Sequence, residues 1–375
     1  METIPRVLIL GGQGRIGSCV ARDLLAYTQA NLAIAGRHRR LSDPLASHGF
    51  GRSRSQFLAV DLDDQETLHK AIQSADLVIH CAGPFKYRDG RVLQHCLETG
   101  TNYLDVSDSR EFVQKLLSQR DRAKAAGITA IVSSGVFPGI SNSMARQGVE
   151  QLESVEEIHL SYVVAGSGGA GVTVMRTTFL ELQEAFPAWI NGQWQSIPPY
   201  SDREIVQFPA PYGRSAVYWF NTIEAFTLPH SFPVKTVVTK FGSVPDFYNH
   251  LTWATARWFP QRWLQDVQTV ESLARISYRM TQVTDRFSGT GIAMRATICG
   301  QREGQPARCS LVMSAEDTAA VAGAGTGSIA QLLLSGKLQQ PGVWPVEQVL
   351  PTAFFQRAMQ QRHLEIQTNG LAATC

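Results

Sequence analysis

The feature that most constrains the fold is a glycine-rich turn early in the chain. A short apolar run, Val7-Leu8-Ile9-Leu10, leads into Gly11-Gly12-Gln13-Gly14-Arg15-Ile16-Gly17, and a helical pattern of apolar residues follows over residues 18–26. A strand that enters a helix through G-x-G-x-x-G is typical of a dinucleotide site. Glycine-rich turns also occur wherever a strand meets a helix, so a purely structural turn is the alternative.

Each glycine of this turn has a predicted task. Gly12 allows the tight turn out of the strand, Gly14 lets the backbone approach a pyrophosphate, and Gly17 lets the helix pack closely on the strand. The phosphates are expected at the positive end of the helix, on its first N–H groups. A second apolar strand, residues 32–35, follows at βαβ spacing and favours the nucleotide site. The predicted cofactor contacts here are Gly12, Gln13, Gly14, Arg15 and Ile16.

The end of the second strand predicts which nicotinamide cofactor binds. NAD sites place an acidic residue here, on the ribose 2′-OH, whereas an arginine accommodates the 2′-phosphate of NADP. The chain reads Gly36-Arg37-His38-Arg39-Arg40, with no carboxylate. Gly36 and Arg37 are therefore predicted cofactor residues, and the predicted cofactor is NADP(H). Arg39 and Arg40 either add charge for the phosphate or simply lie in a solvated loop.

Three later segments are predicted to complete the cofactor site. A strand over residues 57–60 ends at Asp61, whose carboxylate is expected to reach the adenine amino group. A strand over residues 77–79 leads into a small-residue loop beside the ribose and nicotinamide. In the third segment a Pro-Gly turn opens a helix and offers N–H groups to the carboxamide, or acts as a hinge. The residues are Cys81, Ala82, Gly83, Pro84 and Phe85 in the loop, and Phe137, Pro138 and Gly139 in the turn. Phe85 either walls the nicotinamide ring or belongs to the core.

The order of the predicted elements gives the fold class. Strands alternate with helices as far as residues 129–132, which predicts a Rossmann-like parallel sheet. After about residue 150 this rhythm stops. Strands over residues 157–164, 294–300 and 307–313, the last two forming a hairpin around Gly304, predict an inserted α+β domain with a largely antiparallel sheet.

Five segments, in order, resemble the saccharopine dehydrogenase-like oxidoreductases of the reductase type, which carry an N-terminal NADP-binding domain. They are GGQGRIG, CAGPF, YLDVSD, GVFPGISN and TGSIAQLLLSGKLQQPGVWPVE. The resemblance implies a Rossmann domain of residues 1–145 completed by C-terminal helices within residues 326–375. It implies an inserted domain, residues 146–325, that dimerises or holds substrate. It also implies nicotinamide-dependent oxidation or reduction at a carbon–nitrogen bond.

Two polar residues are the candidates for proton transfer. Asp105 and Ser107 follow the strand that starts near Tyr103, on the rim where the nicotinamide is expected. A carboxylate at Asp105 can bind a substrate amine or act as a general base. The competing interpretation is that Ser107, Asp108 or Asp105 caps the helix that begins near Arg110.

Composition narrows the class of protein further. The chain has 375 residues, of which 44% are hydrophobic and 18% charged, and its net charge is +2, so no basic nucleic-acid face is expected. Six cysteines without C-x-x-C spacing predict a reducing, cytoplasmic location, no disulfide and no metal site. Polar residues interrupt the aromatic segment 247–264, so no membrane span is expected, and membrane contact is the minority interpretation. A homodimer through the middle sheet is the expected assembly.

Two functions remain open from the sequence. The first is an NADP(H)-dependent oxidoreductase acting on an imine or secondary amine, or on a related carbonyl or enoyl substrate. The second is a non-catalytic descendant that keeps the nucleotide and acts as a redox sensor or partner-binding protein. Saccharopine, with three carboxylates, would require several convergent basic residues. The middle domain contains Arg176, Arg203, Arg214, Lys235, Lys240 and Arg257, whose spacing does not cluster them, so the small-molecule substrate is left open.

Overall fold

The chain forms two compact units. A computed structural model describes residues 4–39, 54–166, 172–264 and 266–372. Unit 1 consists of Met1–Ile140 and Ala319–Arg362, and unit 2 of Ser141–Thr318 and His363–Cys375. Unit 2 therefore also contains the end of the chain, which the sequence had assigned with the C-terminal helices to the first domain.

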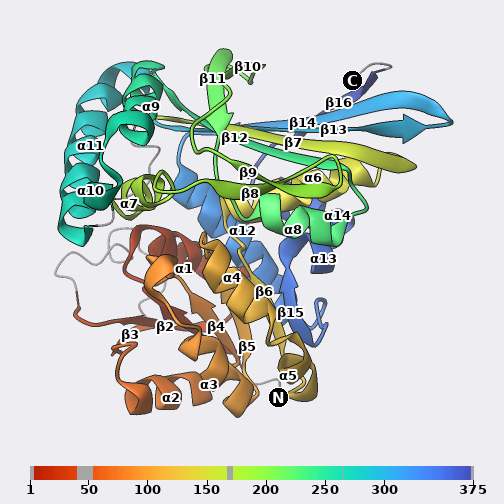
Figure 1. The fold of residues 1–375 in the computed structure, drawn as a ribbon. Helices are drawn as coiled ribbons and strands as arrows, with labels where there is room; N and C mark the ends of the chain where they lie inside the picture. Colours follow the sequence, from red (N-terminus) through yellow and green to blue (C-terminus); the bar gives the residue numbers. More distant parts are fainter. Residues whose placement is uncertain (1–3, 40–53, 167–171, 265, 373–375) are drawn as a thin grey trace. The chain divides into compact units, whose positions relative to one another are not determined.

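Unit 1 is built on a parallel sheet. Within the described residues this sheet has seven strands in the order β15-β6-β5-β4-β1-β2-β3 (Figure 1). Every pair is parallel. The strands are β1 (Arg6–Leu10), β2 (Asn31–Gly36), β3 (Ser55–Ala59), β4 (Leu77–His80), β5 (Asn102–Asp105), β6 (Thr129–Val132) and β15 (Gly342–Pro345). The predicted Rossmann-like sheet is confirmed, and β15 is a strand that the sequence did not predict.

The strand order identifies where a ligand can bind in such a sheet. The chain passes outward from β1 through β2 to β3, and then returns to β4 on the other side of β1. The reversal between β1 and β4 is the topological switch point, and dinucleotides bind at the carboxyl ends of the strands there. The loops that follow β1 and β4 are the two predicted cofactor loops.

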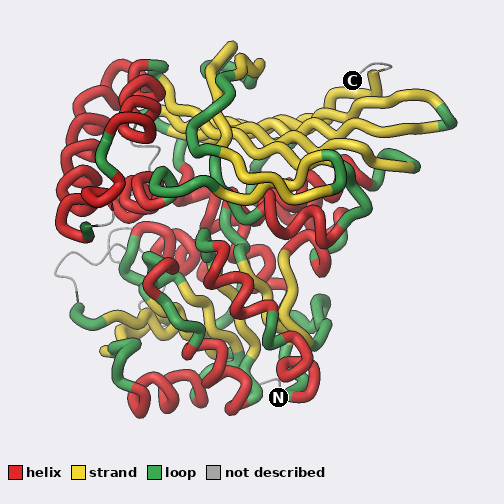
Figure 2. The backbone as a smooth tube through the Cα atoms, in the orientation of Figure 1, coloured by secondary structure: helices red, strands yellow, loops and turns green. Residues whose placement is uncertain are grey.

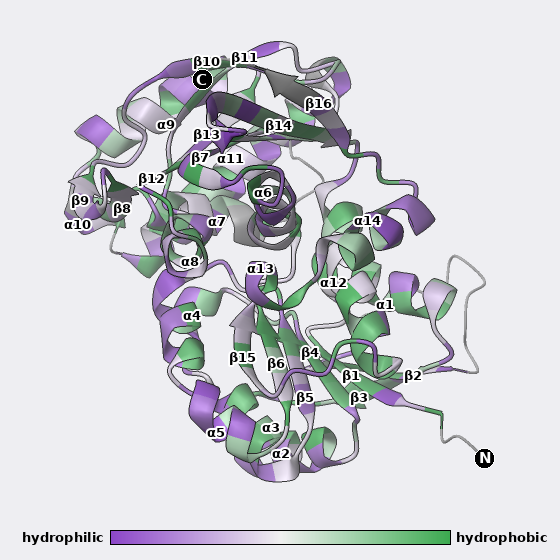
Figure 3. Cartoon of the chain, turned by 90° about the vertical axis from the view of Figure 1, so that its right-hand side faces the viewer, coloured by the Kyte–Doolittle hydropathy of each residue, from purple (hydrophilic) through white to green (hydrophobic). Residues whose placement is uncertain are grey.

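Helices cover both faces of this sheet, as Figures 2 and 3 show. They are α1 (Arg15–Tyr27), α2 (Gln65–Gln73), α3 (Arg91–Thr99), α4 (Arg110–Leu117), α5 (Arg120–Ala125), α12 (Thr318–Leu334), α13 (Val346–Val349) and α14 (Thr352–Gln361). A parallel strand that is covered by helices on both faces consists of a continuous run of apolar residues. Accordingly β1 is buried from Val7 to Leu10, and Figure 3 shows the central strands largely in the hydrophobic colour.

The late helices are joined to α1 by small side chains and one ion pair. A Cβ on Gly323 would lie 2.7 Å from the backbone of Cys19, and a Cβ on Gly327 would overlap Asp23. At the end of α14, Arg362 donates two hydrogen bonds to the Asp23 carboxylate, at 2.8 and 2.7 Å. Burial raises the pKa of Asp23, against the guanidinium, which lowers it. Residues 319–362 are therefore packed into unit 1.

Unit 2 contains the second sheet. Its order is β10-β11-β12-β7-β13-β14-β16, and among its described strands only β12 and β7 pair in parallel. The strands are β7 (Ser154–Ala165), β10 (Glu204–Gln207), β11 (Arg214–Trp219), β12 (Thr236–Val244), β13 (Gly291–Arg302), β14 (Gln305–Ala315) and β16 (Gln367–Ala372), while β8 (Phe186–Ile190) and β9 (Gln193–Ile197) pair separately. The largely antiparallel sheet is confirmed, as is the hairpin, whose turn has positive φ at Glu303 and Gly304.

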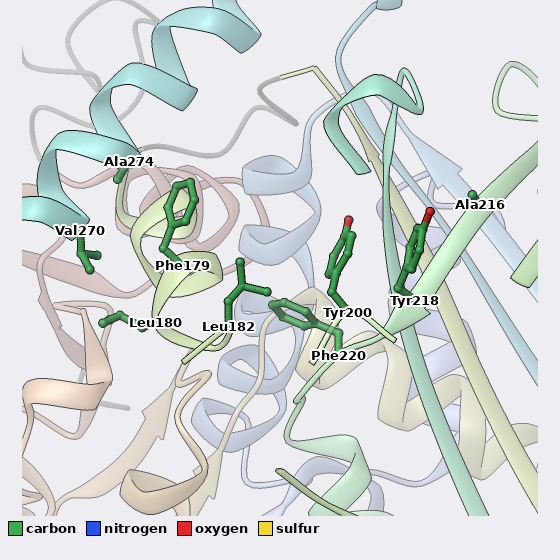
Figure 4. Close-up of a cluster of buried hydrophobic side chains, with 9 residues drawn as sticks. All are labelled: Phe179, Leu180, Leu182, Tyr200, Ala216, Tyr218, Phe220, Val270 and Ala274. Carbon is green, nitrogen blue, oxygen red and sulfur yellow. The ribbon is translucent and has the colours of Figure 1, made fainter. Parts of the chain in front are cut away.

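Helices and an aromatic cluster pack against this sheet. The helices are α6 (Ser141–Val149), α7 (Val172–Leu180), α8 (Glu224–Ser231), α9 (Phe247–Trp258), α10 (Gln261–Leu264) and α11 (Val267–Ser288). Figure 4 shows the rings of Tyr200 and Tyr218 face to face in the cluster, with centroids 4.6 Å apart. The buried Tyr200 hydroxyl donates to Asn249 Oδ1 at 2.7 Å. This pairing satisfies the polar group within an apolar core.

Two expectations about the whole chain have different outcomes. Cys299, on β13, is disulfide-bonded, so the prediction of no disulfide was wrong; spacing along the chain does not show which thiols the fold brings together. The described cysteines Cys19, Cys81, Cys96 and Cys309 are not in disulfide bonds. Among the described residues no helix has the length and apolar character needed to cross a membrane.

We expect Gly17→Ala to destabilise the protein. The new Cβ would lie 2.4 Å from the carbonyl oxygen of Gly11 and 2.8 Å from the Cα of Gly12, and neither backbone atom can rotate away. The overpacking costs about 1–3 kcal/mol, which exceeds the roughly 1 kcal/mol gain in helix propensity. A lower Tm in a thermal melt checks this. Gly36→Ala is the control, because its Cβ would meet nothing nearer than 4.0 Å, and an unchanged Tm for Gly17→Ala would contradict the packing argument.

Candidate functional site

The turn after β1 is held by backbone contacts that leave no room for side chains. Gly11 has a φ of +73°, and a Cβ there would lie 2.9 Å from the backbone of Ala82 in the loop after β4. Gly11 therefore makes the tight turn that the motif had assigned to Gly12. A Cβ on Gly12 would instead lie 2.9 Å from the Ile34 side chain. The two cofactor loops thus touch at the switch point through bare backbone.

The start of α1 has the properties of a phosphate site. Gly14 is the N-cap residue and, as a glycine, it provides no side-chain capping hydrogen bond at this end of the helix. A Cβ on Gly14 would meet only the carbonyl oxygen of Gly11, at 3.0 Å, so a ligand can approach the backbone from the other side. Arg15 is exposed, Ile16 is half-buried and Gln13 is buried. Gly17 packs against Gly11, as predicted from the motif.

The ends of β2 and β3 lie together at the expected adenosine end of the site. Gly36 pairs with Ala59, and the Val60 N–H donates to the Gly36 carbonyl at 3.1 Å. Arg37 follows with an exposed side chain. Asp61 is also exposed, and its Oδ1 accepts the N–H of Asp63 at 3.1 Å. Arg39 is exposed, and Arg40 lies outside the described residues.

A second arginine, Arg88, lies near Arg37, and the sequence analysis did not identify it as a site residue. Arg88 donates from Nε to the Ala82 carbonyl at 2.8 Å, which fixes its guanidinium beneath the loop after β4. Burial lowers the pKa of Arg88, the carboxylate of Asp63 raises it, and the positive charge of Arg37 lowers it. Arg37 and Arg88 are therefore close enough to repel each other. The short 3₁₀ turn Phe85–Tyr87 reverses the chain, so that Arg88 returns to this loop. The sequence contains no pattern that predicts this turn.

The loop after β4 is anchored by a buried aromatic group. Residues 81–84 are half-buried, whereas Phe85 is 4% exposed and packs against His80 and Phe112, with ring centroids 5.0 and 5.2 Å apart. This agrees with the core alternative for Phe85. The Ala82 N–H donates to His80 Nδ1 at 3.3 Å, and burial, with the charge of Arg88, lowers the pKa of His80 to about 3. Burial raises the pKa of the Cys81 thiol, which therefore stays protonated.

Asp105 is the centre of a buried hydrogen-bond network. Its Oδ1 accepts hydrogen bonds from the Ser107 N–H at 2.9 Å, the Ser107 hydroxyl at 2.7 Å and the Ser133 N–H at 2.7 Å. Its Oδ2 accepts from the Tyr103 hydroxyl at 2.9 Å. Asp105 and Ser107 are both 0% exposed. Burial raises the pKa of Asp105, against the hydrogen bonds from Ser107 and Ser133, which lower it.

The contacts of Asp105 and Ser107 fix the position of the segment that follows β6. The Asp105 carbonyl also accepts from the Ser134 N–H and hydroxyl, at 2.8 and 2.7 Å, so Asp105 holds the start of the segment after β6. Direct proton transfer by Asp105 or Ser107 stays a prediction. The capping alternative was wrong, because the N-cap of α4 is Ser109, without a side-chain cap bond.

The segment after β6 continues this network. Gly139 has a φ of +129°, and a Cβ there would lie 2.6 Å from the Ser134 carbonyl carbon. Ser134 is itself bonded to Thr326 of α12, whose hydroxyl donates to the Ser134 carbonyl at 3.1 Å. Pro138 and Gly139 are buried, and Phe137 is half-buried. The segment is held firmly in unit 1; the carboxamide and hinge roles stay predictions.

The basic residues considered for binding substrate carboxylates are mostly paired. Arg176 pairs with Glu271, Arg203 with Asp246 and Lys235 with Glu156. The buried ammonium of Lys240 contacts Asp202 and Glu204 at 2.8 and 2.9 Å. These four side chains already have carboxylate partners within unit 2, so they give no sign of a tricarboxylate pocket.

A family model matches the first unit of the chain. Residues 7–131 correspond to the saccharopine dehydrogenase NADP binding domain. This stretch begins in β1 and ends in β6, and it includes the loops after β1 and β4. The match covers the strands and the glycine turn at the switch point of the sheet, so the structure and the comparison agree on a nucleotide-binding domain of the NADP type in this part of the chain.

Similarity to individual proteins extends beyond that domain. A probable mitochondrial saccharopine dehydrogenase-like oxidoreductase of Arabidopsis thaliana is 29% identical over 190 residues, which are 45% of this chain and 42% of that protein. The chain thus spans less than half the length of this relative. A carboxyaminopropylagmatine dehydrogenase of Synechocystis sp. is 23% identical over 381 residues, covering 93% of this chain and 94% of that protein.

A solved structure shares the whole fold. Apo saccharopine dehydrogenase (L-Glu forming) from Saccharomyces cerevisiae superposes with a TM-score of 0.72, over 98% of this chain and 100% of that chain, at 14% identity. The resemblance seen in the sequence is confirmed: residues 7–131 match the saccharopine dehydrogenase NADP binding domain, relatives carry the name saccharopine dehydrogenase-like oxidoreductase, and the fold matches that of a saccharopine dehydrogenase.

We expect Asp105→Ala to destabilise the protein by about 3 kcal/mol or more. It leaves the buried N–H groups of Ser107 and Ser133 without an acceptor, and each such loss costs about 1–3 kcal/mol. The free energy of unfolding from urea titration checks this. Tyr103→Phe, which removes one donor, should cost about 1 kcal/mol. The control is Asp121→Ala, whose carboxylate is 94% exposed; an equal effect of the two aspartate variants would contradict the network.

We expect acid to destabilise the protein partly through His80. The pKa of His80 is about 3 when folded and its ordinary value is 6.5, so between these values only the unfolded chain binds the proton. Stability from this group is therefore complete above pH 6.5 and is lost as pH falls towards 3, at up to about 1.4 kcal/mol per pH unit. His80→Gln should flatten the dependence of the free energy of unfolding on pH by this amount. The control is His250→Gln, which replaces a 67% exposed side chain; equal slopes for wild type and His80→Gln would overturn the assignment.

Proposed function

We propose that the chain is an NADP(H)-dependent oxidoreductase that oxidises or reduces a carbon–nitrogen bond, interconverting an imine and a secondary amine. The observation that carries the proposal is the pair of loops at the switch point of the unit 1 sheet, with Arg37 and no carboxylate at the end of β2. A non-catalytic descendant that keeps the nucleotide would need the same loops, so the turnover assay described below separates the two functions.

The residues present fit such a cofactor. The start of α1 and the bare backbone of Gly14 offer N–H groups to a pyrophosphate. Arg37, with Arg88 beneath the loop after β4, provides positive charge for a 2′-phosphate, a group that carries roughly two negative charges. Asp61 lies exposed two residues after β3, and its carboxylate is the group that we assign to the adenine amino group. Residues 81–84 present a half-buried backbone beside the expected position of the nicotinamide.

The nicotinamide, when bound, supplies or accepts the hydride. The chain must then orient the reactants, exclude water and move one proton at the substrate nitrogen. We assign Asp105 and Ser107 to orientation: through Ser133 and Ser134 they hold the segment that contains Phe137, Pro138 and Gly139. In this role they act through that segment rather than by touching the substrate.

The name of one relative supports the proposed class of substrate, a carboxylated amine. The Synechocystis relative, which aligns over nearly the whole chain, is named for carboxyaminopropylagmatine, an amine that carries a carboxyl group. A carboxyalkylated amine formed from a keto acid and an amine is therefore the first substrate class to test. A carbonyl or enoyl compound is the second substrate class to test. The homodimer and the cytoplasmic location stay predictions from the sequence.

The cofactor assignment is tested by fluorescence titration with NADPH and NADH. Arg37→Asp should weaken NADPH binding by about 10- to 100-fold, because a charge-assisted contact is worth about 1.5–3 kcal/mol, and should affect NADH far less. Arg122→Asp, which changes an arginine of α5 that donates to Gln119, is the matched control. Equal loss of the two nucleotides would remove the 2′-phosphate assignment.

The reaction is tested by following NADPH absorbance with panels of keto acid plus amine, and with carbonyl and enoyl compounds. Turnover that requires both a keto acid and an amine is the expected result. Turnover on the carbonyl or enoyl panel alone would favour the second substrate class. Tight NADPH binding without turnover on any panel would favour the non-catalytic descendant.

A further inference from the structure

A cluster of possible metal ligands lies away from the cofactor loops, between α2 and α3. His69 Nδ1 and His95 Nδ1 are 3.1 Å apart, and Glu98 Oε2 lies 3.3 Å from His95 Nδ1 and 3.7 Å from His69 Nδ1. These three atoms form one compact triangle. His95 is buried, whereas His69 and Glu98 are 37% and 44% exposed at their side chains, so the triangle is open to solvent on one side.

The geometry of the two helices produces the cluster. His95 and Glu98 are three residues apart on α3 and therefore lie on one face of that helix. His69 is on the middle turn of α2, and Figures 1 and 3 both show α2 next to α3. The edge-to-face arrangement of the two imidazoles brings their Nδ1 atoms together, with centroids 5.2 Å apart. The contact joins residues 26 positions apart along the chain.

When both imidazole rings are neutral, protons alone satisfy this triangle poorly. Gln65 Oε1 lies 3.1 Å from His95 Nε2 and accepts its proton, so in the neutral ring the lone pair is on Nδ1. That lone pair then faces both the Glu98 carboxylate and His69. A proton on His69 Nδ1 can bridge to one of these acceptors, which leaves two acceptors turned towards each other. A cation in the triangle attracts all three atoms at once.

The surrounding side chains orient the three atoms as they do in metal sites. Metal-binding imidazoles usually donate their second nitrogen to an oxygen acceptor, as His95 does to Gln65. Gln94 Nε2 donates to Glu98 Oε1 at 2.6 Å, which occupies one carboxylate oxygen and leaves Oε2 facing the rings.

The size of the triangle fits zinc. Zn²⁺ binds histidine nitrogen and carboxylate oxygen at about 2.0–2.2 Å in a tetrahedron, whose edges are then about 3.3–3.6 Å. The three separations here are 3.1, 3.3 and 3.7 Å. We propose that His69, His95 and Glu98 bind a Zn²⁺ ion that joins α2 to α3, with the fourth position open to water on the exposed side. The ion is separate from the proposed oxidoreductase chemistry.

The test uses the full chain without a histidine tag, stripped with a chelator and titrated with Co²⁺ as a spectroscopic substitute. One ion should bind per chain with the visible absorption of tetrahedral Co²⁺, and Zn²⁺ should displace it. Zn²⁺ should also raise the Tm, since an ion that binds only the folded chain stabilises it. These readouts do not depend on activity, so failure of the proposed function would leave them unchanged.

Variants separate this site from adventitious binding. Gln65 contacts a proposed ligand rather than the ion, so Gln65→Ala should weaken Co²⁺ binding by about 10- to 100-fold. His69→Ala and Glu98→Gln remove a ligand and should each weaken binding more. Glu98→Gln keeps the shape of an exposed side chain, so it tests the site even where a histidine variant fails to fold. His250→Ala and Glu66→Gln, an exposed histidine and an exposed carboxylate outside the cluster, are the matched controls and should bind as wild type does.

Three outcomes would overturn the proposal. The first is wild-type protein that binds neither Co²⁺ nor Zn²⁺, which would make the cluster a hydrogen-bonded network only. The second is binding that His69→Ala and Glu98→Gln leave unchanged. The third is a thiolate-to-Co²⁺ band, which would assign the ion to a cysteine.

Discussion

The structure of unit 1 depends on the close approach of backbone to backbone at its switch point. Gly17 on α1 touches the Gly11 carbonyl, and Gly11 touches Ala82 after β4, at distances that exclude any side chain. This packing brings the first turn of α1 down onto the sheet, where its N–H groups can meet a pyrophosphate. The same device recurs in α12, whose Gly323 and Gly327 lie against α1. Small residues therefore give unit 1 both its compact core and its ligand-binding end.

A buried carboxylate organises the neighbouring strand ends. Asp105 collects hydrogen bonds from Tyr103, Ser107 and Ser133, and its carbonyl holds Ser134. A carboxylate without exposed area is costly to bury unless donors surround it, and here all the donors come from two adjacent strands and the segments that follow them. The network and the glycine contacts together explain why the carboxyl ends of β5 and β6 form a fixed rim.

The prediction from sequence succeeded where the physics is local and failed where it is not. The glycine spacing predicted the turn and the packing of Gly17, although the positive φ falls at Gly11. The sequence left two roles open for Phe85, and only the ring contacts with His80 and Phe112 distinguish them. The sequence did not predict the position of Arg88, because a 3₁₀ turn directs it back to the loop after β4. It did not predict the triangle of His69, His95 and Glu98 either, because these residues come from two different helices. The spacing of the cysteines does not predict the disulfide at Cys299, because the fold decides which thiols meet.

The sequence by itself determined the class of fold and predicted the kind of ligand. Apolar runs, helical periodicity and glycine positions act over a few residues, so they specify strands, helices and a dinucleotide turn without knowledge of the rest of the chain. Only the tertiary structure decided the roles of single polar side chains. Whether Asp105 is exposed, where Arg88 points and which atoms surround His95 depend on residues far away in the chain, because burial and hydrogen bonding are properties of the packed molecule.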